Sequence, residues 1–263
     1  MPFFPMPSKV TEDGTSPKDP IKAVLFDIFG TVVDWRGTMV KEFSSLFLQK
    51  GITDIDCEAF VESWVTAYSQ NMSDISEDKK PFAIVDELNK IALDHTLDQY
   101  HITDRFSDVE KEHMWMIWHR LEPWPDSISG IDKLKKQFTI GPLSNGNIKL
   151  LEDLAKHAHL NWDVILSGER FRRYKPDPSV YQMAAEALQL KPSQILLVAS
   201  HPYDLKAAQL CGYKTAYINR PLEFRTVKEK KEEDQFDFVT DSIDTLADTL
   251  QQETTARQSH SPS

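Results

Sequence analysis

Short apolar runs alternate with longer amphipathic segments in the second half of this chain. The runs are residues 138–143, 164–166, 195–199 and 215–218, with a weaker one at 236–239. Each has the length of a strand and is separated from the next by a segment of helical length, which is typical of a parallel sheet covered by helices. Residues 21–26, near the N-terminus, form another apolar run and predict a strand buried on both faces. The pattern predicts an α/β fold.

The segment between these strands has a different pattern. Residues 35–120 contain no convincing strand, and their apolar residues recur at helical spacing, as in Phe60, Trp64 and Ala67. We therefore expect an α/β core formed by residues 21–34 and 121–250, interrupted by a helical insertion at 35–120. Residues 1–20 and 251–263 are rich in Pro, Ser, Thr and Gln, and we predict disordered tails there.

Composition limits the classes of partner. The 263 residues include 30 Lys and Arg against 41 Asp and Glu, a net charge of −11. This charge argues against nucleic acid or an anionic membrane as the main partner. No apolar run approaches the roughly 18 residues needed to span a bilayer, and no secretory core is visible, so we expect a cytoplasmic protein. Cys57 and Cys211 are expected to be reduced thiols.

Polar residues follow the predicted strands at the points where the strands end. Because the carboxyl ends of parallel strands meet at one edge of a sheet, these residues are expected to share a crevice. Taken singly, each has a structural explanation, such as a helix cap or a surface lysine. Together they predict a ligand site in which the first carboxylate is a candidate nucleophile. The residues are Asp27, Ser144, Asn145, Lys175, His201 and Asp204.

These residues carry a resemblance to the haloacid dehalogenase (HAD) superfamily, and within it to the L-2-haloacid dehalogenases, over about residues 21–250. The resemblance implies a HAD-like Rossmannoid parallel sheet, with residues 35–120 as an α-helical cap domain over the active site. It is also compatible with a homodimer. The matching motifs are Asp27-Ile28-Phe29-Gly30-Thr31, Ser144-Asn145, Lys175-Pro176-Asp177-Pro178-Ser179-Val180-Tyr181, and Tyr203-Asp204 at the end of the acidic loop.

The residue two positions after Asp27 favours one chemistry of this superfamily over another. Its phosphatases carry a second aspartate there, which protonates the leaving alkoxide. Here the position holds Phe29, which has no acid–base function. A departing halide needs no proton, so we predict a hydrolytic dehalogenase that converts short (S)-2-haloalkanoic acids to 2-hydroxy acids with inversion. The resemblance implies an ester intermediate on Asp27 and requires no cofactor or metal.

Further roles follow from the same resemblance. Lys175 would bridge to Asp27 and offset the repulsion between that carboxylate and the anionic substrate. Phe29 would form an apolar wall beside the reacting carbon. Hydroxyl and amide groups would orient carboxylates or add a further hydrogen bond. These groups belong to Thr31, Ser144, Asn145 and Tyr181.

The chain also departs from the family pattern. Ala199 and His201 stand where a serine and an asparagine are usual. His201 is a candidate base for the hydrolytic water, oriented by Asp204, or else a histidine that only forms hydrogen bonds in its loop. The dehalogenases use an arginine of the cap domain to bind the halide, and the segment around Ser63 and Trp64 contains no arginine. Arg36 is the nearest replacement, and an ordinary surface arginine is an equal interpretation.

Two other functions remain open at this stage. One is a magnesium-dependent phosphatase with Asp204 as a metal ligand, although Phe29 argues against it. The other is a binding protein of the same fold that has lost turnover, suggested by Ala199 and by the absent arginine. Fold resemblance alone does not choose among them.

Overall fold

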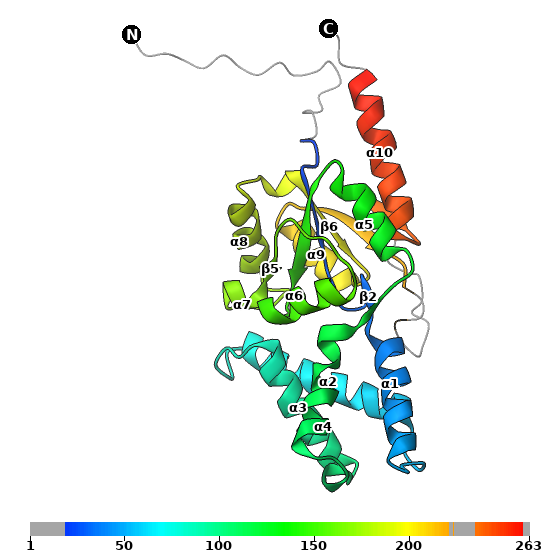
Figure 1. Ribbon diagram of the computed structural model, residues 1–263. Helices are drawn as coiled ribbons and strands as arrows, with labels where there is room; N and C mark the ends of the chain where they lie inside the picture. The colour runs from blue at the N-terminus through cyan, green and yellow to red at the C-terminus, as the bar shows by residue number, and fades with distance from the viewer. Residues whose placement is uncertain (1–18, 221–222, 224–234, 260–263) are drawn as a thin grey trace.

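The computed structural model describes residues 19–220, 223 and 235–259. Its centre is a six-stranded parallel sheet in the order β5-β4-β1-β6-β7-β8 (Figure 1). This confirms the predicted α/β fold class. The strands are β1 (Ala23–Phe26), β4 (Thr139–Ser144), β5 (Leu166–Ser167), β6 (Ile195–Ala199), β7 (Lys214–Ile218) and β8 (Phe238–Thr240).

Strand β1 lies in the interior of the sheet, between β4 and β6. All four of its residues are fully buried, which explains why the run is apolar at successive positions. Ala23 and Leu25 belong to the core on one face, whereas Val24 and Phe26 belong to the core on the other. The strand therefore ends in the buried core, directly before Asp27.

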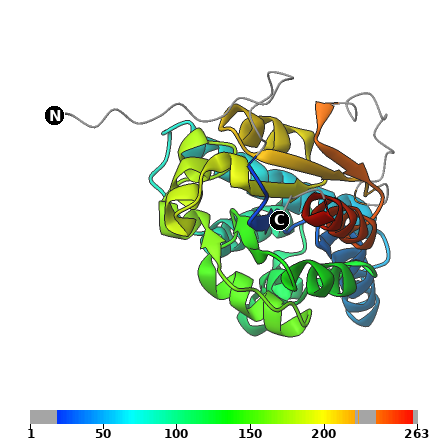
Figure 2. The same ribbon diagram turned by 90° about the horizontal axis from the view of Figure 1, so that it is seen from above.

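Helices cover both faces of the sheet, as the view from above shows (Figure 2). One core includes residues of α8 (Pro178–Leu188) and α9 (Pro202–Leu210). The other includes residues of α5 (Ser127–Lys135), α6 (Ile148–His157) and α10 (Ile243–Ser259). Two shorter helices, α7 (Gly168–Phe171) and η3 (Pro192–Gln194), complete this part of the chain.

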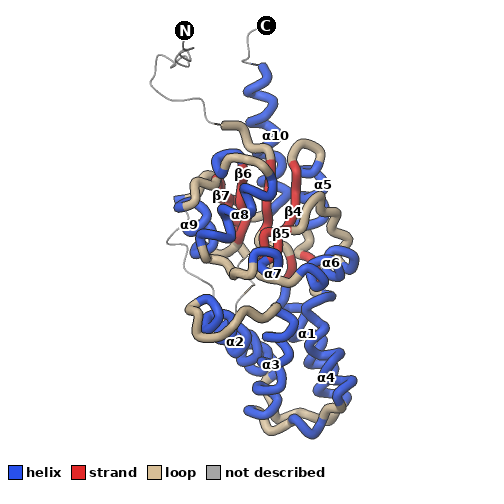
Figure 3. The backbone as a smooth tube through the Cα atoms, turned by 90° about the vertical axis from the view of Figure 1, so that its left-hand side faces the viewer, coloured by secondary structure: helices blue, strands red, loops and turns tan. Residues whose placement is uncertain are grey.

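The segment between β1 and β4 forms a separate group of helices, here called the helical unit (residues 35–120), which lies beyond the carboxyl ends of the strands (Figures 1 and 3). A short antiparallel pair, β2 (Val33–Asp34) with β3 (Glu122–Pro123), joins it to the sheet. The unit comprises α1 (Trp35–Gln49), α2 (Cys57–Ser76), α3 (Val85–Gln99), η1 (Thr103–Arg105), α4 (Asp108–Trp115) and η2 (Met116–Arg120).

A polar clamp holds the helical unit against the sheet. The Asn147 side chain accepts a hydrogen bond from the backbone N–H of Asp86 (3.2 Å) and donates one to the Asp86 carboxylate (2.9 Å). His119 contacts Asp86 through Nε2 and Asp153 through Nδ1, each at 3.0 Å. Asp86 belongs to α3 and Asp153 to α6, so the clamp joins the two parts of the molecule next to the end of β4.

The C-terminal segment differs from its prediction. Helix α10 continues to Ser259, so residues 251–259 are helical rather than disordered. Leu246 and Leu250 anchor its first half in the core, and the polar residues that follow extend a helix whose first turns are already formed. Residues 1–18 of the tail predicted at 1–20, the charged run at 228–234 and residues 260–263 lie outside the described residues. In the part that is described, no helix is long and apolar enough to cross a membrane.

Candidate active site

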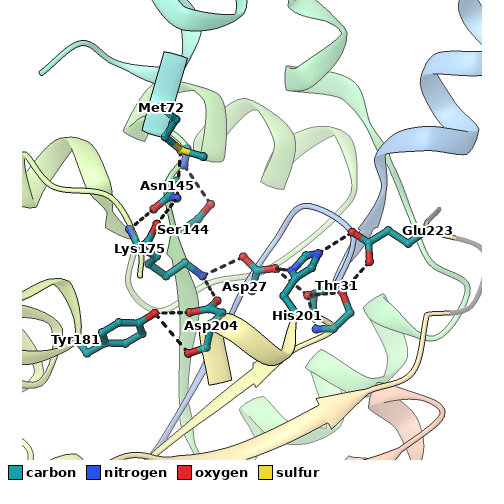
Figure 4. A network of polar contacts seen from close by, with 12 residues as sticks. Asp27, Thr31, Met72, Ser144, Asn145, Lys175, Tyr181, His201, Asp204 and Glu223 are labelled. Atoms are coloured by element: carbon teal, nitrogen blue, oxygen red, sulfur yellow. Dashed lines mark hydrogen bonds and ion pairs between the residues drawn. The ribbon is translucent and has the colours of Figure 1, made fainter. Parts of the chain in front are cut away.

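The site is built around Asp27, the first residue after β1. Its side chain is buried, and both carboxylate oxygens are engaged (Figure 4). Oδ1 lies 2.9 Å from Lys175 Nζ. Oδ2 accepts a hydrogen bond from the Thr31 hydroxyl and contacts His201 Nδ1, both at 2.9 Å. Burial alone would raise the pKa of Asp27, but the charges and hydrogen bonds of Lys175 and His201 outweigh it and lower the pKa well below its usual value. Asp27 is therefore an ionised carboxylate at neutral pH.

A tight turn after Asp27 allows this arrangement. Gly30 has φ +83°, a conformation that glycine adopts without strain. A Cβ atom there would lie only 2.1 Å from Glu223 Oε1, so glycine also leaves room for that side chain. The turn brings Thr31 back to hydrogen-bond with Asp27, four residues earlier.

Lys175 is held from behind by a second carboxylate. Its ammonium group contacts Asp204 as well as Asp27, and Asp204 is almost fully buried. Burial would lower the pKa of Lys175, but the charges of Asp204 and Asp27 outweigh it and raise the pKa. The Tyr181 hydroxyl donates a 2.6 Å hydrogen bond to Asp204 Oδ1. Asp204 and Tyr181 thus fix the charge and position of Lys175.

His201 lies between two carboxylates. Its Nδ1 contacts Asp27, and its Nε2 lies 2.6 Å from Glu223 Oε1. Burial would lower the pKa of His201, but the charges of Glu223 and Asp27 outweigh it and raise the pKa to about 10. In this state His201 is an imidazolium at neutral pH. The prediction that Asp204 orients His201 is wrong, because Asp204 is bound to Lys175 and Tyr181.

Glu223 is the site residue that the sequence did not reveal. It is almost fully buried and also accepts hydrogen bonds from Ser200 Oγ (3.2 Å) and Trp35 Nε1 (3.4 Å). It lies five residues after the end of β7 and belongs to none of the quoted motifs. The available signal was its place beyond a further strand end of the same sheet edge.

The remaining predicted residues have different positions. Ser144 is buried, and its Oγ accepts the backbone N–H of Gly146, which stabilises the turn after β4. Asn145 forms two hydrogen bonds with the backbone of Lys175, through Oδ1 at 2.7 Å and Nδ2 at 3.2 Å. Phe29 packs edge-on against Trp118 of the helical unit, with ring centres 5.3 Å apart.

Arg36 does not join this group. Its guanidinium is bound by two glutamates of α2, with an Nη2 to Glu58 distance of 2.7 Å. This geometry does not support the prediction that Arg36 replaces the absent arginine of the cap at the site. The reason is local: both glutamates present carboxylates on the neighbouring helix, and a buried or half-buried arginine pairs with the nearest carboxylates.

The donor set around Asp27 does not suit a divalent cation. Magnesium prefers several oxygen ligands and retains waters. Here the two oxygens of Asp27 face the cations Lys175 and His201, and an apolar ring occupies position 29. Within residues 19–220, 223 and 235–259, no cluster of three or more His, Cys, Asp and Glu side chains is arranged to hold a metal ion.

Comparisons with known proteins agree with this picture. Residues 21–212 match the family model of haloacid dehalogenase-like hydrolases. (S)-2-haloacid dehalogenase 1 of Pseudomonas sp. (strain CBS-3) is 30% identical over 215 residues, which cover 77% of this chain and 86% of that protein. (S)-2-haloacid dehalogenase 4A of Burkholderia cepacia is 28% identical over 77% of this chain and 84% of its own length.

Solved structures give the same result. The crystal structure of a defluorinating L-2-haloacid dehalogenase has a TM-score of 0.84 and 37% identity, covering 88% of this chain and 95% of that one. Another L-2-haloacid dehalogenase has a TM-score of 0.80 and 34% identity, with 88% and 99% of the two chains covered. The family match spans most of the chain and includes the residues that surround Asp27 up to Asp204. The chain therefore belongs to the haloacid dehalogenase-like hydrolases.

Proposed function

We propose that this protein hydrolyses the carbon–halogen bond of short (S)-2-haloalkanoic acids and releases 2-hydroxy acids with inverted configuration. The observation that carries the proposal is the state of Asp27: a buried carboxylate, kept ionised by Lys175 and His201, beside Phe29 rather than a second acid. Relatives named (S)-2-haloacid dehalogenases support the same substrate class. The helical unit serves as a cap over the reacting groups.

In the first step, an oxygen of Asp27 attacks C2 of the substrate from the side opposite the halogen. The C2–O bond forms as the carbon–halogen bond breaks, and the halide leaves with the bonding electron pair. Two unit charges 4 Å apart repel by about 4 kcal/mol at an effective dielectric of 20, so the anionic substrate needs nearby cations. Lys175 and His201 supply them at Asp27 itself.

In the second step, water attacks the Asp27 carboxyl carbon and splits the ester. Esterification removes the charge of Asp27, one of the two carboxylates that raise the pKa of His201, so that pKa falls and Nδ1 releases its proton to solvent, as the one proton that the overall reaction liberates. His201, with Nε2–H still donated to Glu223, then takes a proton from the water. When the tetrahedral intermediate collapses, the second proton of the attacking water passes to the departing alkoxide, and Asp27 is restored as a carboxylate.

A direct assay tests the proposal. The full chain is incubated in EDTA with each enantiomer of 2-chloropropionate while chloride and lactate are measured, and p-nitrophenyl phosphate is tested in parallel with magnesium. We expect chloride and (R)-lactate from the (S) enantiomer, and no chloride from Asp27→Asn. Phosphate release that requires magnesium, without chloride from either enantiomer, would contradict the proposal and favour a phosphatase. Binding of haloacid without any product would favour a protein that has lost turnover.

A further inference from the structure

Arg220, two residues after β7, binds the backbone of the turn that follows Asp27. Its Nε donates a hydrogen bond to the Thr31 carbonyl oxygen at 3.0 Å. Its two terminal nitrogens pair with the two oxygens of Asp126, at 2.8 and 3.0 Å. The Arg220 side chain is only 7% exposed. Because a bidentate pair fixes the guanidinium in one orientation, Arg220 holds the Thr31 backbone in a defined place.

Thr31 in turn connects the backbone of this turn to the groups around Asp27 (Figure 4). Its hydroxyl donates to Asp27 Oδ2 and accepts the backbone N–H of Ser200, both at 2.9 Å. Ser200 precedes His201 in the chain, and its own hydroxyl donates to Glu223 at 3.2 Å. A shift of the Thr31 backbone would therefore disturb both Asp27 and the segment that carries His201.

The backbone of Arg220 also contacts the second carboxylate residue beside His201. The backbone N–H of Glu223 donates to the Arg220 carbonyl oxygen at 3.2 Å. The Glu223 side chain then reaches His201 Nε2 at 2.6 Å. Arg220 is thus bound to Thr31 through its side chain and to Glu223 through its backbone. Since Asp27 and Glu223 lie on the two sides of the His201 ring, Arg220 links the supports of both carboxylates.

The segment in which the chain returns from the helical unit completes the surroundings of Arg220. The Trp124 indole N–H donates to the Gly30 carbonyl oxygen at 3.0 Å, and the Arg220 guanidinium lies over its ring, 5.4 Å from the ring centre. Asp126 also accepts the backbone N–H of Ile243, at the start of α10, at 2.6 Å. Trp124, Asp126 and Arg220 are here called the arginine anchor. A carboxylate, a ring face and a carbonyl oxygen together suit a planar guanidinium better than an ammonium.

We propose that Arg220 is a positioning residue for ester hydrolysis, which acts through Thr31 and Glu223 to keep Asp27 and His201 in the geometry that water attack requires. The proposal rests on the dehalogenase function proposed above. Arg220 transfers no proton, so its contribution is geometric. Ester formation depends less on it, because Lys175 still contacts Asp27 when the anchor is loosened.

Arg220→Lys in the full chain tests this role. Lysine keeps the positive charge but cannot bind both Asp126 oxygens and the Thr31 carbonyl group together. We expect kcat for (S)-2-chloropropionate to fall by about 10²-fold, the cost of a misplacement of about 1 Å. The value of kcat/KM should change far less, because it includes only the steps up to halide release. A burst of one chloride per protein should precede the slow phase.

Arg120→Lys is the matched control. The Arg120 guanidinium also binds one carboxylate, that of Glu42, and one backbone carbonyl group, that of His113 at 2.9 Å. These partners all belong to the helical unit, so the variant loses the same kinds of bond away from the turn after Asp27. We expect its kcat to equal that of the wild type, with no burst.

A second readout needs no turnover. An imidazolium N–H that donates to a carboxylate over a short distance gives a proton NMR signal far downfield of other N–H protons. Glu223→Gln identifies the signal of His201 Nε2–H by removing the charged acceptor. We expect Arg220→Lys to shift or broaden this signal and Arg120→Lys to leave it in place.

Asp126→Asn loosens the same guanidinium without changing Arg220. It should lower kcat and shift the His201 signal in the same direction as Arg220→Lys, by smaller amounts. If Asp126 acts through Arg220, the double variant should be no slower than Arg220→Lys alone, because the two residues form one unit. Circular dichroism melting establishes that each variant is folded at the assay temperature, and Asp126→Asn decides the question if Arg220→Lys does not fold.

Two results would overturn this inference. In the first, the variants of the anchor melt earlier but keep the wild-type kcat and His201 signal, which would make Arg220 a structural residue only. In the second, kcat/KM falls as much as kcat and no burst is seen, so that ester formation is the step that needs Arg220. Failure of the proposed function has a different signature: the wild type releases no halide from any 2-haloacid, yet the His201 signal still depends on Arg220.

Discussion

At the scale of single residues, the proposed mechanism rests on the charges of Asp27 and His201, which change when Asp27 is esterified. His201 holds its proton because two carboxylates face it, and esterification of Asp27 removes one of those charges. Glu223 then determines how His201 behaves in the second step. In the proposed mechanism, the residue that performs the substitution thus also controls when the base becomes available.

Glu223→Gln tests this relationship. The change removes the negative charge that orients His201 and that stabilises the imidazolium formed when His201 takes a proton from the attacking water. We therefore expect ester hydrolysis to slow by about 10²-fold or more, within the range for general-base catalysis. Formation of the ester should be affected far less. The measurement is a rapid burst of one chloride per protein followed by slow release, together with an intact mass increased by one 1-carboxyethyl group, which is propionate bonded through C2 to an oxygen of Asp27.

Glu62→Gln is the control for this variant, because Glu62 binds Arg36 within the helical unit and does not reach Asp27. It should show no burst and normal turnover. If Glu223→Gln also lacks a burst, or if both steps slow equally, Glu223 does not act in the second step through His201.

Most residues of this site are predictable from the sequence, because parallel topology brings the residues that follow each strand to one edge of the sheet. Asp27, Lys175, His201 and Asp204 were found in this way. Pairings between long side chains were not predictable: Arg36 pairs with glutamates of the next helix, and Glu223 reaches His201 from a segment without a motif. Such choices depend on distances across the fold, which sequence spacing does not contain.

At the scale of secondary-structure elements, Asn147 connects the turn after β4 to the start of α3. The N-terminus of α3 has no side-chain cap of its own, because its N-cap residue is Ile84. Asn147 instead supplies the acceptor for the Asp86 N–H from across the interface and also donates to the Asp86 carboxylate. The N-terminus of α3 in the helical unit is thus capped by a residue of the sheet-bearing part of the molecule.

Asn147→Ala should lower the free energy of unfolding by about 1–2 kcal/mol, the usual cost of losing a helix cap and leaving a buried group unpaired. Urea unfolding followed by circular dichroism measures this change. Asn161→Ala is the matched control, since Asn161 is exposed and interacts with Lys135 at the surface, and it should change stability by less than about 0.5 kcal/mol. Equal effects of the two variants would show that the clamp does not stabilise the interface.

The sequence predicted the strands, and the helical structure of the insertion at residues 35–120, more reliably than the residues at which elements end. Helix α10 shows the reason, because residues 251–259 have a polar composition and yet extend a helix that is anchored at Leu246 and Leu250. Composition describes a segment alone, whereas an existing helix supplies the costly first turn to the residues that follow it.

At the scale of the whole molecule, stability should depend on the protonation of His201. Its pKa in the folded protein is about 10, above the ordinary value of 6.5. The stabilising contribution is therefore complete below about pH 6.5 and is lost as the pH rises toward 10, by at most about 1.4 kcal/mol per pH unit. Urea unfolding at pH 7 and pH 9.5 should show a larger loss for the wild type than for His201→Asn. Identical losses would mean that His201 is not charged in the folded state.

The charged side chains of the site also gather at one edge of the sheet. The charges around Asp27 come from the segments after β1, β5, β6 and β7, and the helical unit adds Tyr68, Met72 and Trp118 above them. Because Tyr68 and Trp118 are buried and Met72 is half-buried, we expect substrate entry to displace part of the helical unit.

In the proposed mechanism, Asp27 forms the ester and water attacks its carboxyl carbon. A single turnover in ¹⁸O-labelled water, with protein in excess over (S)-2-chloropropionate, distinguishes this route from direct attack of water on C2. We expect mass spectrometry to find the label in the peptide that contains Asp27 and not in the first lactate released. Label in the lactate, with an unlabelled Asp27 peptide, would contradict it.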